Sequence, residues 1–381
     1  MKIFLFRISS VILAFAFGCE IFLILAYSGD KSKGPLSDLF VTVNTGVARI
    51  EKKMTRPREH RSAVLKWFDF YRNNPAALNK PDTLFWGAYD DNTAESYESI
   101  VALEDSLKIN LPIISLYTAW GSKKNEVFPL LRAQAIYDMG SIPMITWEPW
   151  LNDFDPEDFP VNAKTEDKNK NGLREIAEGK FDGYIDEWAK DAKKFGASFF
   201  LRFGHEMNDP FRYPWGPQNN KPEEFIAAWR HVVDRFHNAG ANNAVWVWSP
   251  NSAYSYVDFY PGQQYVDWIG TTAINYGTVA TWSQWWSLDV IFKKFYDNAS
   301  RTKKPIIITE FGSLSVGGDR AAWYTQALAS LREKYPAVKS VVFFHVADDN
   351  TTTYKSLDWS FKNDGKVIKS IRMSLDSFKK R

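Results

Sequence analysis

A repeating pattern of secondary-structure signals runs through most of the chain and limits the folds that it can adopt. From Asp82 onward, short apolar runs rich in β-branched and aromatic residues alternate with amphipathic stretches of helical length. Such alternation is typical of βα units, in which helices cover a parallel sheet. The eight strands that we predict are residues 83–89, 111–117, 142–147, 198–203, 244–248, 268–274, 305–309 and 340–345.

Helical stretches fit between most of these strands. The clearest are residues 94–108, 184–195, 223–238, 285–298 and 320–334. Eight βα units over roughly 300 residues match a (β/α)8 barrel, which usually needs about 250 residues and tolerates insertions. The alternative is an open, doubly wound sheet, but no glycine-rich phosphate-binding motif follows the first predicted strand. We therefore predict a single (β/α)8 TIM barrel domain over residues 81–381.

The N-terminal part of the chain has a different character. Lys2 and Arg7 precede residues 8–27, in which Glu20 is the only charge, and this apolar segment is long enough for a membrane-spanning helix. Small residues before Gly29 also fit a signal-peptide cleavage site, so we predict that residues 1–28 are either a signal peptide or a membrane anchor. Both alternatives predict an exported protein, either secreted or periplasmic, or tethered to a membrane and facing away from the cytoplasm.

Residues 29–80 connect this segment to the predicted barrel. They are charged and irregular, apart from an amphipathic stretch at 58–71 that would place Val64, Leu65 and Phe68 on one side of a helix. We predict that residues 29–80 form a stalk or an N-terminal cover. Cys19 is the only cysteine, so no intrachain disulfide can stabilise the exported domain.

Charge and aromatic content narrow the classes of function. The chain has 47 Lys and Arg against 45 Asp and Glu, a formal net charge of +2, and so lacks the basic excess of a nucleic-acid-binding protein. Phe, Tyr and Trp make up 16% of the residues. Because aromatic rings offer flat surfaces on which sugar rings can stack, this surplus favours a carbohydrate ligand.

In a (β/α)8 barrel the catalytic residues lie at the C-terminal ends of the strands. One aromatic residue at such an end is more often packed between strand and loop, but aromatic residues at most of the ends favour a cleft that binds carbohydrate. The aromatic and polar residues at the predicted ends are Trp86, Tyr89, Tyr117, Trp120, Trp147, Glu148, Trp150, Arg202, His205, Trp248, Asn251, Tyr276, Glu310 and His345.

Two carboxylates stand out among the residues at the strand ends. Glu206 comes three residues after the fourth predicted strand, and Glu310 directly follows the seventh. These strands lie across the barrel mouth from each other, so the two glutamates could face one glycosidic bond from both sides. Hydrolysis of that bond requires an acid that protonates the leaving oxygen and a second carboxylate that attacks or stabilises the sugar. Arg202 and His205 are near enough to orient one of the carboxylates.

The same region carries a family resemblance. The chain resembles glycoside hydrolase family 26, a clan A family of (β/α)8 barrels that contains mostly endo-β-mannanases, together with β-1,3-1,4-glucanases and β-1,3-xylanases. The matching runs, in the expected order, are RFGHEMND (202–209), YPWG (213–216), VWVWSPN (245–251), FYPG with YVDWIG (259–270), INYG (274–277), ITEFGS (308–313) and LDW (357–359).

This resemblance implies a retaining mechanism in which Glu206 is the acid/base and Glu310 the nucleophile, and it implies no required cofactor. Tyr276 matches a tyrosine that hydrogen-bonds the nucleophile, and Trp147 and Trp215 match positions that line the sugar subsites. With the neighbouring residues at the strand ends included, the predicted substrate-binding residues are His205, Arg202, Tyr276, Trp215, Trp147, Trp120, Trp248 and Phe211.

The residues after Glu206 depart from the family pattern. The family usually has a small residue and then a tryptophan before the aromatic-Pro-Trp-Gly run, whereas this chain has Asp209-Pro210-Phe211-Arg212. The histidine that is common at the first strand of mannanases is also absent. Because the runs TWEPW (146–150) and YPWG are closer to the β-glucanase branch, a β-glucan is favoured over a β-mannan as substrate.

A second, independent pattern lies between the third predicted strand and its helix. Asp167, Asn169, Asn171 and Glu178 occupy positions 1, 3, 5 and 12 of a 12-residue calcium loop, with Gly172 at position 6. The alternative is a polar, solvated insertion. If calcium binds, it would be structural and would take no part in the chemistry.

Together these patterns predict an endo-β-glycanase that hydrolyses a β-linked polysaccharide or oligosaccharide by double displacement. Two alternatives use the same residues. A non-hydrolytic accessory of polysaccharide synthesis or export would bind carbohydrate on the same aromatic surface, and a transglycosylase would differ only in its acceptor.

Overall fold

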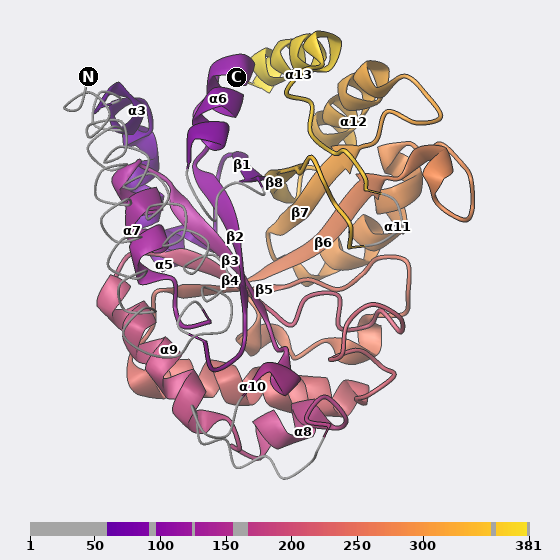
Figure 1. Cartoon of the computed structure of the whole chain (residues 1–381). Coiled ribbons are helices and arrows are strands. Elements are labelled where there is room, and N and C mark those ends of the chain that lie inside the picture. Colours follow the sequence, from indigo (N-terminus) through magenta and orange to yellow (C-terminus); the bar gives the residue numbers. More distant parts are fainter. Residues whose placement is uncertain (1–58, 91–96, 124–125, 155–166, 352–355, 379–381) are drawn as a thin grey trace, which may run out of the picture. The chain divides into compact units, whose positions relative to one another are not determined.

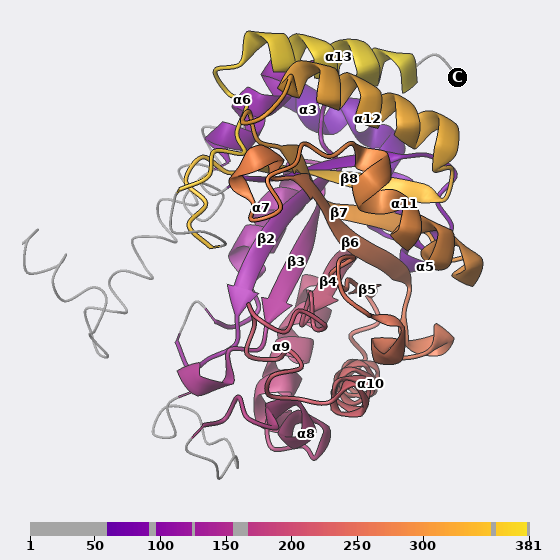
Figure 2. The ribbon, with the colours of Figure 1, turned by 90° about the vertical axis from the view of Figure 1, so that its right-hand side faces the viewer.

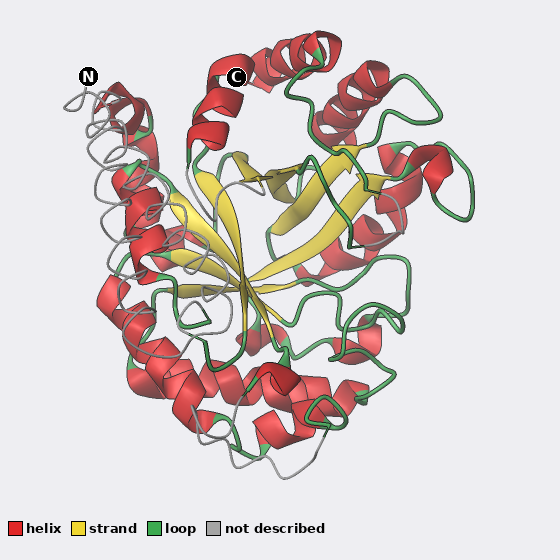
Figure 3. Ribbon diagram, in the orientation of Figure 1, coloured by secondary structure: helices red, strands yellow, loops and turns green. Residues whose placement is uncertain are grey.

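The computed structural model describes residues 59–378 except 91–96, 124–125, 155–166 and 352–355. Eight parallel strands pair in sequence order, and β1 pairs with β8 to close the barrel. The strands lie at the centre and helices surround them (Figures 1 and 3). This arrangement confirms the predicted (β/α)8 barrel.

All eight predicted strands are present. β7 continues to Ser313, past the predicted end at Thr309, so Glu310 lies inside a strand rather than directly after one. The pairing of β7 with β8 is irregular between Ile308 and Phe311, which is where Glu310 departs from a regular ladder. The strand bounds are β1 Phe85–Asp90, β2 Ile113–Ala119, β3 Ile142–Glu148, β4 Phe199–Phe203, β5 Ala244–Trp248, β6 Trp268–Asn275, β7 Ile306–Ser313 and β8 Val338–His345.

The helices begin and end at residues that the sequence marks clearly. The side chains of Ser287 and Asp319 accept hydrogen bonds from backbone N–H groups at the starts of α11 and α12. Gly196 and Gly240 end α9 and α10 with φ of 74° and 76°, a backbone region that favours glycine. The helix bounds are α6 Glu98–Leu107, α7 Leu130–Asp138, α8 Gly172–Ala177, α9 Asp182–Phe195, α10 Pro222–Ala239, α11 Leu288–Ala299, α12 Arg320–Lys334 and α13 Gly365–Phe378.

Short 3-10 helices occupy several of the loops. They are η4 Leu151–Asp153, η5 Val257–Phe259, η6 Gln263–Tyr265, η7 Gly277–Val279 and η8 Ser300–Thr302.

Residues 59–80 cover the N-terminal end of the barrel and belong to the compact unit that begins at Arg58. The prediction of one amphipathic helix over 58–71 is wrong because the segment divides into several short helices. Leu65 and Phe68 are buried as predicted, but Val64 is 54% exposed. The helices of this segment are α3 Glu59–Val64, η2 Lys66–Phe68, α4 Asp69–Arg72 and α5 Pro75–Leu78.

Side chains along each strand alternate between the barrel interior and the surrounding helices. Near the N-terminal ends of the strands the interior positions are apolar and buried. Two residues further along, Thr146 follows Met144 on β3 and Arg202 follows Phe200 on β4, so the interior becomes polar. The apolar cluster comprises Phe68, Tyr71, Leu78, Phe85, Ile113, Ile142, Met144, Phe200, Val245, Val247, Trp268, Ile307 and Val342.

A larger apolar layer lies between the strands and the helices. Trp147 of β3 stacks on Trp188 of α9, with ring centroids 4.2 Å apart and 24° between the ring planes. Burial of a large apolar side chain in such a layer contributes roughly 2–3 kcal/mol. The helices also pack on one another, α12 on α13 and α8 on α10 (Figure 2). Much of the aromatic surplus of the chain is used here.

No helix within the described ranges has both the length and the apolar character needed to cross a membrane. The predicted signal or anchor segment, residues 8–27, and the first part of the predicted stalk, residues 29–58, lie outside these ranges.

Candidate active site

Glu310 is held by a layer of hydrogen bonds that crosses the barrel interior. Tyr117 donates its hydroxyl proton to Glu310 Oε1 at 2.8 Å, and Arg202 Nη2 donates to the same oxygen at 2.8 Å. Arg202 is fully buried and also donates to Thr146 Oγ1 at 2.9 Å and to Thr309 Oγ1 at 2.8 Å. Within the described part of the chain no donor contacts Oε2. Glu310 is therefore anchored as an anion through one oxygen, and the other is available for reaction.

Glu206 lies on the loop that follows β4. Its backbone has a φ of 50°, a left-handed conformation that costs a residue with a Cβ on the order of 1 kcal/mol. A hydrogen bond from Glu206 N to Ser249 O, at 2.8 Å, ties this strained residue to the end of β5. The side chain is 2% exposed, and its Oε2 lies 3.3 Å from Arg212 Nη1. Backbone strain of this kind clusters at functional sites.

The two glutamates act on each other electrostatically. Burial raises the pKa of Glu206, and the negative charge of Glu310 raises it further, while Arg212 and Arg202 oppose the increase. One carboxyl group is thus anchored as an anion and the other is biased toward its protonated form. That division matches the roles of nucleophile and acid/base.

Glu148 is a third carboxylate of the site, at the end of β3. Burial raises the pKa of Glu148 to about 7, although Trp150 Nε1 donates a hydrogen bond to its Oε2 at 3.3 Å. His205 Nδ1 lies 4.0 Å from Glu148 Oε1. Because burial and the charges of Arg202 and Arg212 hold the pKa of His205 well below its usual value, the imidazole is neutral at pH 7.

Three of the tryptophans predicted to bind substrate are buried away from the barrel mouth. Trp120 and Trp147 are 0% exposed with ring centroids 4.5 Å apart, and Trp248 is 3% exposed against Tyr260. Trp147 and Trp248 are buried because side chains along a strand alternate between the barrel interior and the surrounding helices. Glu148 lies beside His205 in the site, so its neighbour Trp147 faces the helices. The prediction that these three rings contact sugar is corrected accordingly.

Trp215 is a buried residue that packs against His205 and Tyr213. It is 2% exposed, its Nε1 donates to His205 O at 2.7 Å, and its ring stacks on Tyr213 with centroids 4.7 Å apart. Tyr213 in turn contacts the imidazole through a bond of 3.0 Å between its hydroxyl and His205 Nε2. The ring of Trp215 therefore orients His205 and Tyr213 rather than offering a face to a sugar.

Phe211 is the predicted substrate-binding aromatic that remains open to solvent. It is 79% exposed, and its ring centroid lies 6.1 Å from that of Tyr254. An exposed ring beside a second aromatic ring at the edge of the site can serve as a stacking surface.

Tyr276 lies within electrostatic reach of Arg212, and its predicted hydrogen bond to the nucleophile stays a prediction. Among the described residues, the tyrosine that donates to Glu310 is Tyr117. Tyr276 packs edge-on against Trp359 and Trp282, at centroid distances of 5.0 and 6.0 Å.

Four residues of the site had no role predicted from the sequence: Tyr117, Glu148, Arg212 and Trp282. Tyr117 and Glu148 stand at predicted strand ends, and alternation in step with Arg202 could have placed both inside the barrel. Trp282 is 44% exposed and stacks on Trp286 at 4.9 Å. Arg212 and Trp282 lie on loops, where no periodic signal reveals the direction of a side chain.

The predicted calcium residues do not form a 12-residue calcium loop. Helix α8 begins at Gly172, so Glu178 is separated from Asn171 by a helical rise of roughly 10 Å. Glu178 Oε1 lies 4.0 Å from Arg174 Nε, and Asp167 Oδ1 accepts hydrogen bonds from Asn152 Nδ2 and Asn169 N. Groups of three or more His, Cys, Asp or Glu side chains suited to a metal ion are absent from the residues described. Glu178 therefore lies apart from the other three residues of the predicted loop, and calcium binding stays a prediction.

A small cavity lies elsewhere, between α6, α13 and the end of β8, with a volume of about 100 Å³. It is lined by Asp90, Ser99 and His345 among others, and His345 Nδ1 lies 2.9 Å from Asp90 Oδ2. Neither Glu206 nor Glu310 lines this cavity, so it is separate from the carboxylate site.

Comparison with known protein families decides how the carboxylate site is classified. The family model for Glycosyl hydrolase family 26 matches residues 124–326, which is more than half of the chain. The chain belongs to glycosyl hydrolase family 26. The family resemblance predicted from the sequence is confirmed.

Relatives of this family 26 chain include glucan- and mannan-degrading enzymes. It is 34% identical over 293 residues to Endoglucanase H of Acetivibrio thermocellus, an alignment that covers 74% of the chain and 29% of that protein. It is 25% identical over 173 residues to a mannan endo-1,4-beta-mannosidase of Bacillus subtilis, covering 43% of each. The chain thus spans less than half the length of these two relatives.

Solved structures of family 26 share its fold. A β-mannanase from Bacteroides ovatus superposes with a TM-score of 0.57 at 18% identity, covering 79% of this chain and 91% of the other. The mannanase of Bacillus subtilis gives a TM-score of 0.54 at 18% identity, covering 77% and 87%. These similarities support the barrel architecture.

Proposed function

We propose that this family 26 protein is a retaining endo-β-glycanase that prefers a β-glucan substrate. The observation that carries the proposal is the asymmetry of the two glutamates. Arg202 and Tyr117 anchor Glu310 as an anion through one oxygen, whereas burial biases Glu206 toward its protonated form. A retaining glycosidase requires this division between nucleophile and acid.

Each carboxyl group has one role in each half of the reaction. Glu310 Oε2 attacks the anomeric carbon, the glycosidic bond breaks, and Glu206 gives its proton to the leaving oxygen. Glu206, now a carboxylate, removes a proton from a water molecule that attacks the same carbon. The bond between the sugar and Glu310 then breaks, which restores both groups and keeps the anomeric configuration.

Several observations support a β-glucan as the substrate. The longest aligned relative described above is an endoglucanase, and the runs TWEPW and YPWG are closer to the β-glucanase branch. Mannan is the competing substrate because four of the relatives are named mannan endo-1,4-beta-mannosidases. Phe211 and Trp282 are the exposed aromatic residues that we propose as sugar-stacking surfaces. Tyr276 would contact the sugar beside them.

The proposed substrate is extracellular, and we propose that the protein is exported. Residues 8–27 form an apolar segment preceded by Lys2 and Arg7. Such a segment acts either as a cleaved signal peptide or as a membrane tether.

A reducing-end assay on barley β-glucan, mannan, xylan and cellulose tests the proposed activity. We expect most activity on barley β-glucan and, by proton NMR, a first product with the anomeric configuration of the substrate. Binding of glucan without new reducing ends would instead identify an accessory protein. Products longer than the substrate would identify a transglycosylase.

Two variants test the roles of the carboxylates. Glu206→Gln and Glu310→Gln should each lower kcat by roughly 10³-fold or more while circular dichroism and thermal melting stay near wild type. Glu187→Gln is the matched control, since Glu187 lies on α9 with a side chain 65% exposed. Activity within tenfold of wild type in either catalytic variant would contradict the assignment.

A further inference from the structure

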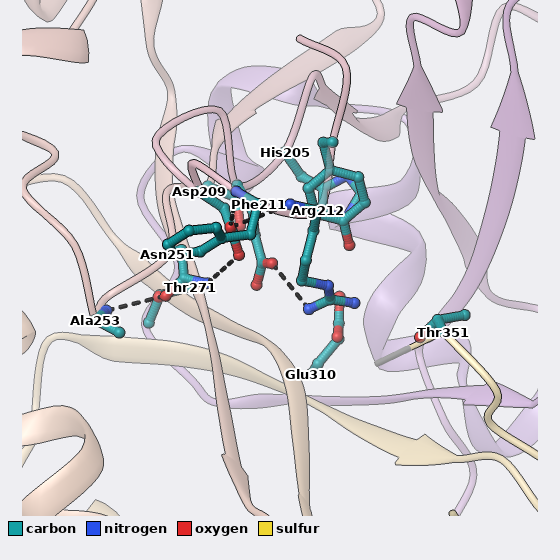
Figure 4. A network of polar contacts seen from close by, with 12 residues as sticks. His205, Asp209, Phe211, Arg212, Asn251, Ala253, Thr271, Glu310 and Thr351 are labelled. Carbon is teal, nitrogen blue, oxygen red and sulfur yellow. Dashed lines mark hydrogen bonds and ion pairs between the residues drawn. The ribbon is translucent and has the colours of Figure 1, made fainter. Parts of the chain in front are cut away.

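The loop that follows Glu206 is built around the buried side chain of Asp209. Asp209 is 2% exposed, and its Oδ1 accepts hydrogen bonds from the backbone N–H groups of Phe211 at 2.9 Å and Arg212 at 3.3 Å. Its Oδ2 accepts a bond of 3.3 Å from Asn251 Nδ2 (Figure 4). These hydrogen bonds hold the turn against the loop after β5, and they fix the backbone position of Arg212.

The side chain of Arg212 points to the space between the two catalytic carboxylates. Arg212 Nη1 lies 3.3 Å from Glu206 Oε2, and Figure 4 shows its guanidinium group beside the side chain of Glu310. Burial alone would lower the pKa of Arg212, but Tyr213, Glu206, Tyr276 and Glu310 together raise it. In the free protein this cation therefore lies near both carboxyl groups, between which a glycosidic bond must bind.

The two arginines of the site differ in how firmly they are held. Arg202 is 0% exposed and donates to Thr146, Thr309, Tyr117 and Glu310. The guanidinium of Arg212 has one hydrogen bond among the described residues, its side chain is 29% exposed, and it lies 5.0 Å above the ring of Tyr213. Arg202 is a fixed part of the barrel, whereas Arg212 can move toward solvent at the cost of one long hydrogen bond.

A guanidinium group beside Glu206 conflicts with acid catalysis. A nearby positive charge favours the carboxylate form, but Glu206 must carry a proton when the leaving oxygen departs. A cation near both carboxyl groups would also crowd a sugar linkage bound between them. Both conflicts disappear if the arginine leaves when the sugar chain arrives.

We propose that Arg212 is a positioning residue that pairs with Glu206 between the two carboxylates in the free enzyme and is displaced when a glycan chain enters. Glu206 then loses a neighbouring positive charge and holds its proton more firmly, so the acid is strengthened when substrate is bound. This inference rests on the proposed glycanase function.

The pH dependence of hydrolysis tests this displacement. The fall of kcat/KM at high pH reports the pKa of the acid in the free enzyme. The fall of kcat at high pH reports the pKa of the same acid in the substrate complex. In Arg212→Met we expect the basic limb of kcat/KM to move up by about one pH unit, because removal of a positive charge lets Glu206 keep its proton to higher pH. The basic limb of kcat should not move, since the arginine has already left. Arg212→Lys should restore most of the wild-type limb.

The outcomes separate displacement from other roles of the side chain. Equal movement of both limbs would mean that Arg212 stays beside Glu206 during the reaction, and unmoved limbs would mean that it has only a structural role. Either result overturns the proposal. Arg332→Met is the matched control, because Arg332 is 32% exposed and pairs with Glu333 at 3.1 Å on α12.

A second measurement does not depend on activity. Carbon-13 NMR titration of the Glu206 carboxyl carbon, assigned by its loss in Glu206→Gln, should give a pKa about one unit higher in free Arg212→Met than in free wild type. Equal values within about 0.2 units would overturn the ion pair. If the titration shows the shift but no polysaccharide is cleaved, the proposed function fails while the pairing of Arg212 with Glu206 stands.

Discussion

The two ends of the barrel are made from the same eight strands but are stabilised in different ways. At the N-terminal end, Phe68 and Leu78 of the covering helices join a wholly apolar cluster inside the strands. At the C-terminal end, the interior is filled by Arg202 and its hydrogen-bond partners, among them Tyr117 and Glu310. The first end depends on apolar burial, and the second depends on hydrogen bonds and ion pairs among buried polar groups.

This difference shows why stability and chemistry are separated along the strands. Apolar packing is non-directional, so it tolerates small shifts in the positions of side chains. A buried guanidinium such as Arg202 tolerates neither a missing partner nor a displaced one, because an unpaired buried charge is costly. The polar end therefore holds Glu310 in one position, as catalysis requires.

Removal of Arg202 should produce the largest loss of stability of any single change at the polar end. Arg202→Met leaves Glu310 and two threonines without their donor, and we expect a loss of about 3–5 kcal/mol in the free energy of unfolding. We also expect kcat/KM to fall by roughly 10²-fold or more. Urea denaturation and glucan hydrolysis measure the two effects.

Arg202→Lys is the fallback if the methionine variant does not fold, because it keeps the charge but not the planar fork of donors. A double-mutant cycle with Glu310→Gln should show a coupling energy above about 1 kcal/mol. Additive losses would contradict a direct dependence of Glu310 on Arg202.

A change at the apolar end should affect stability alone. Phe68 is 0% exposed and its ring lies 5.1 Å from that of Phe85, so Phe68→Ala should cost about 3–5 kcal/mol of unfolding free energy. The kcat and KM of the folded variant should equal those of wild type below its melting temperature. A change in kcat/KM larger than about threefold would show that the two ends are coupled.

Glu148 should make the polar end sensitive to pH. Its pKa is about 7 in the folded protein and 4.5 as an ordinary glutamate, so the folded state keeps a proton that the unfolded state loses. Stability must then fall as pH rises from about 4.5 to 7, by at most about 3 kcal/mol from this group, and the effect is constant above pH 7. In Glu148→Gln this part of the pH dependence should be absent.

Urea denaturation of wild type and Glu148→Gln at pH 4.5, 6 and 8 measures that difference. Glu187→Gln, on the exposed face of α9, should follow the wild-type curve. Parallel curves for wild type and Glu148→Gln would mean that the carboxyl group titrates at its ordinary pKa.

The smallest effect is expected from calcium. Because α8 begins at Gly172 and Glu178 lies beside Arg174, we expect thermal melts with calcium and with a chelator to agree within about 1 °C. A rise of several degrees on addition of calcium would restore the calcium loop that the sequence pattern predicts. It would also show that part of the loop following β3 depends on a bound ion.

Most of the barrel could be predicted from the sequence because its signals are local. Strand β5 and helix α12 have the predicted bounds, and each is marked by its own periodicity and end residues. The break of the helix at 58–71 could not be predicted, because Leu65 and Phe68 are buried only when the strands are present, and Phe68 joins the cluster inside them. Tertiary packing overrides helical periodicity there.

The candidate site was predictable in part. Glu206 and Glu310 follow from strand ends and from the family motifs. The buried positions of Trp120, Trp147 and Trp248 were missed because strand ends were examined without regard to which face each residue occupies. The alternation of side chains along β3 and β5 would have predicted the burial of Trp147 and Trp248.

The barrel, the family and the two glutamates could be predicted from residue order, because repeated apolar runs and short motifs act over a few neighbouring residues. The folded chain was needed to show that Tyr117 contacts Glu310, that burial raises the pKa of Glu148 to about 7 and that Arg212 lies beside Glu206. These properties depend on distance and burial between residues from different strands and loops. A linear order of residues does not specify such distances until the chain has folded.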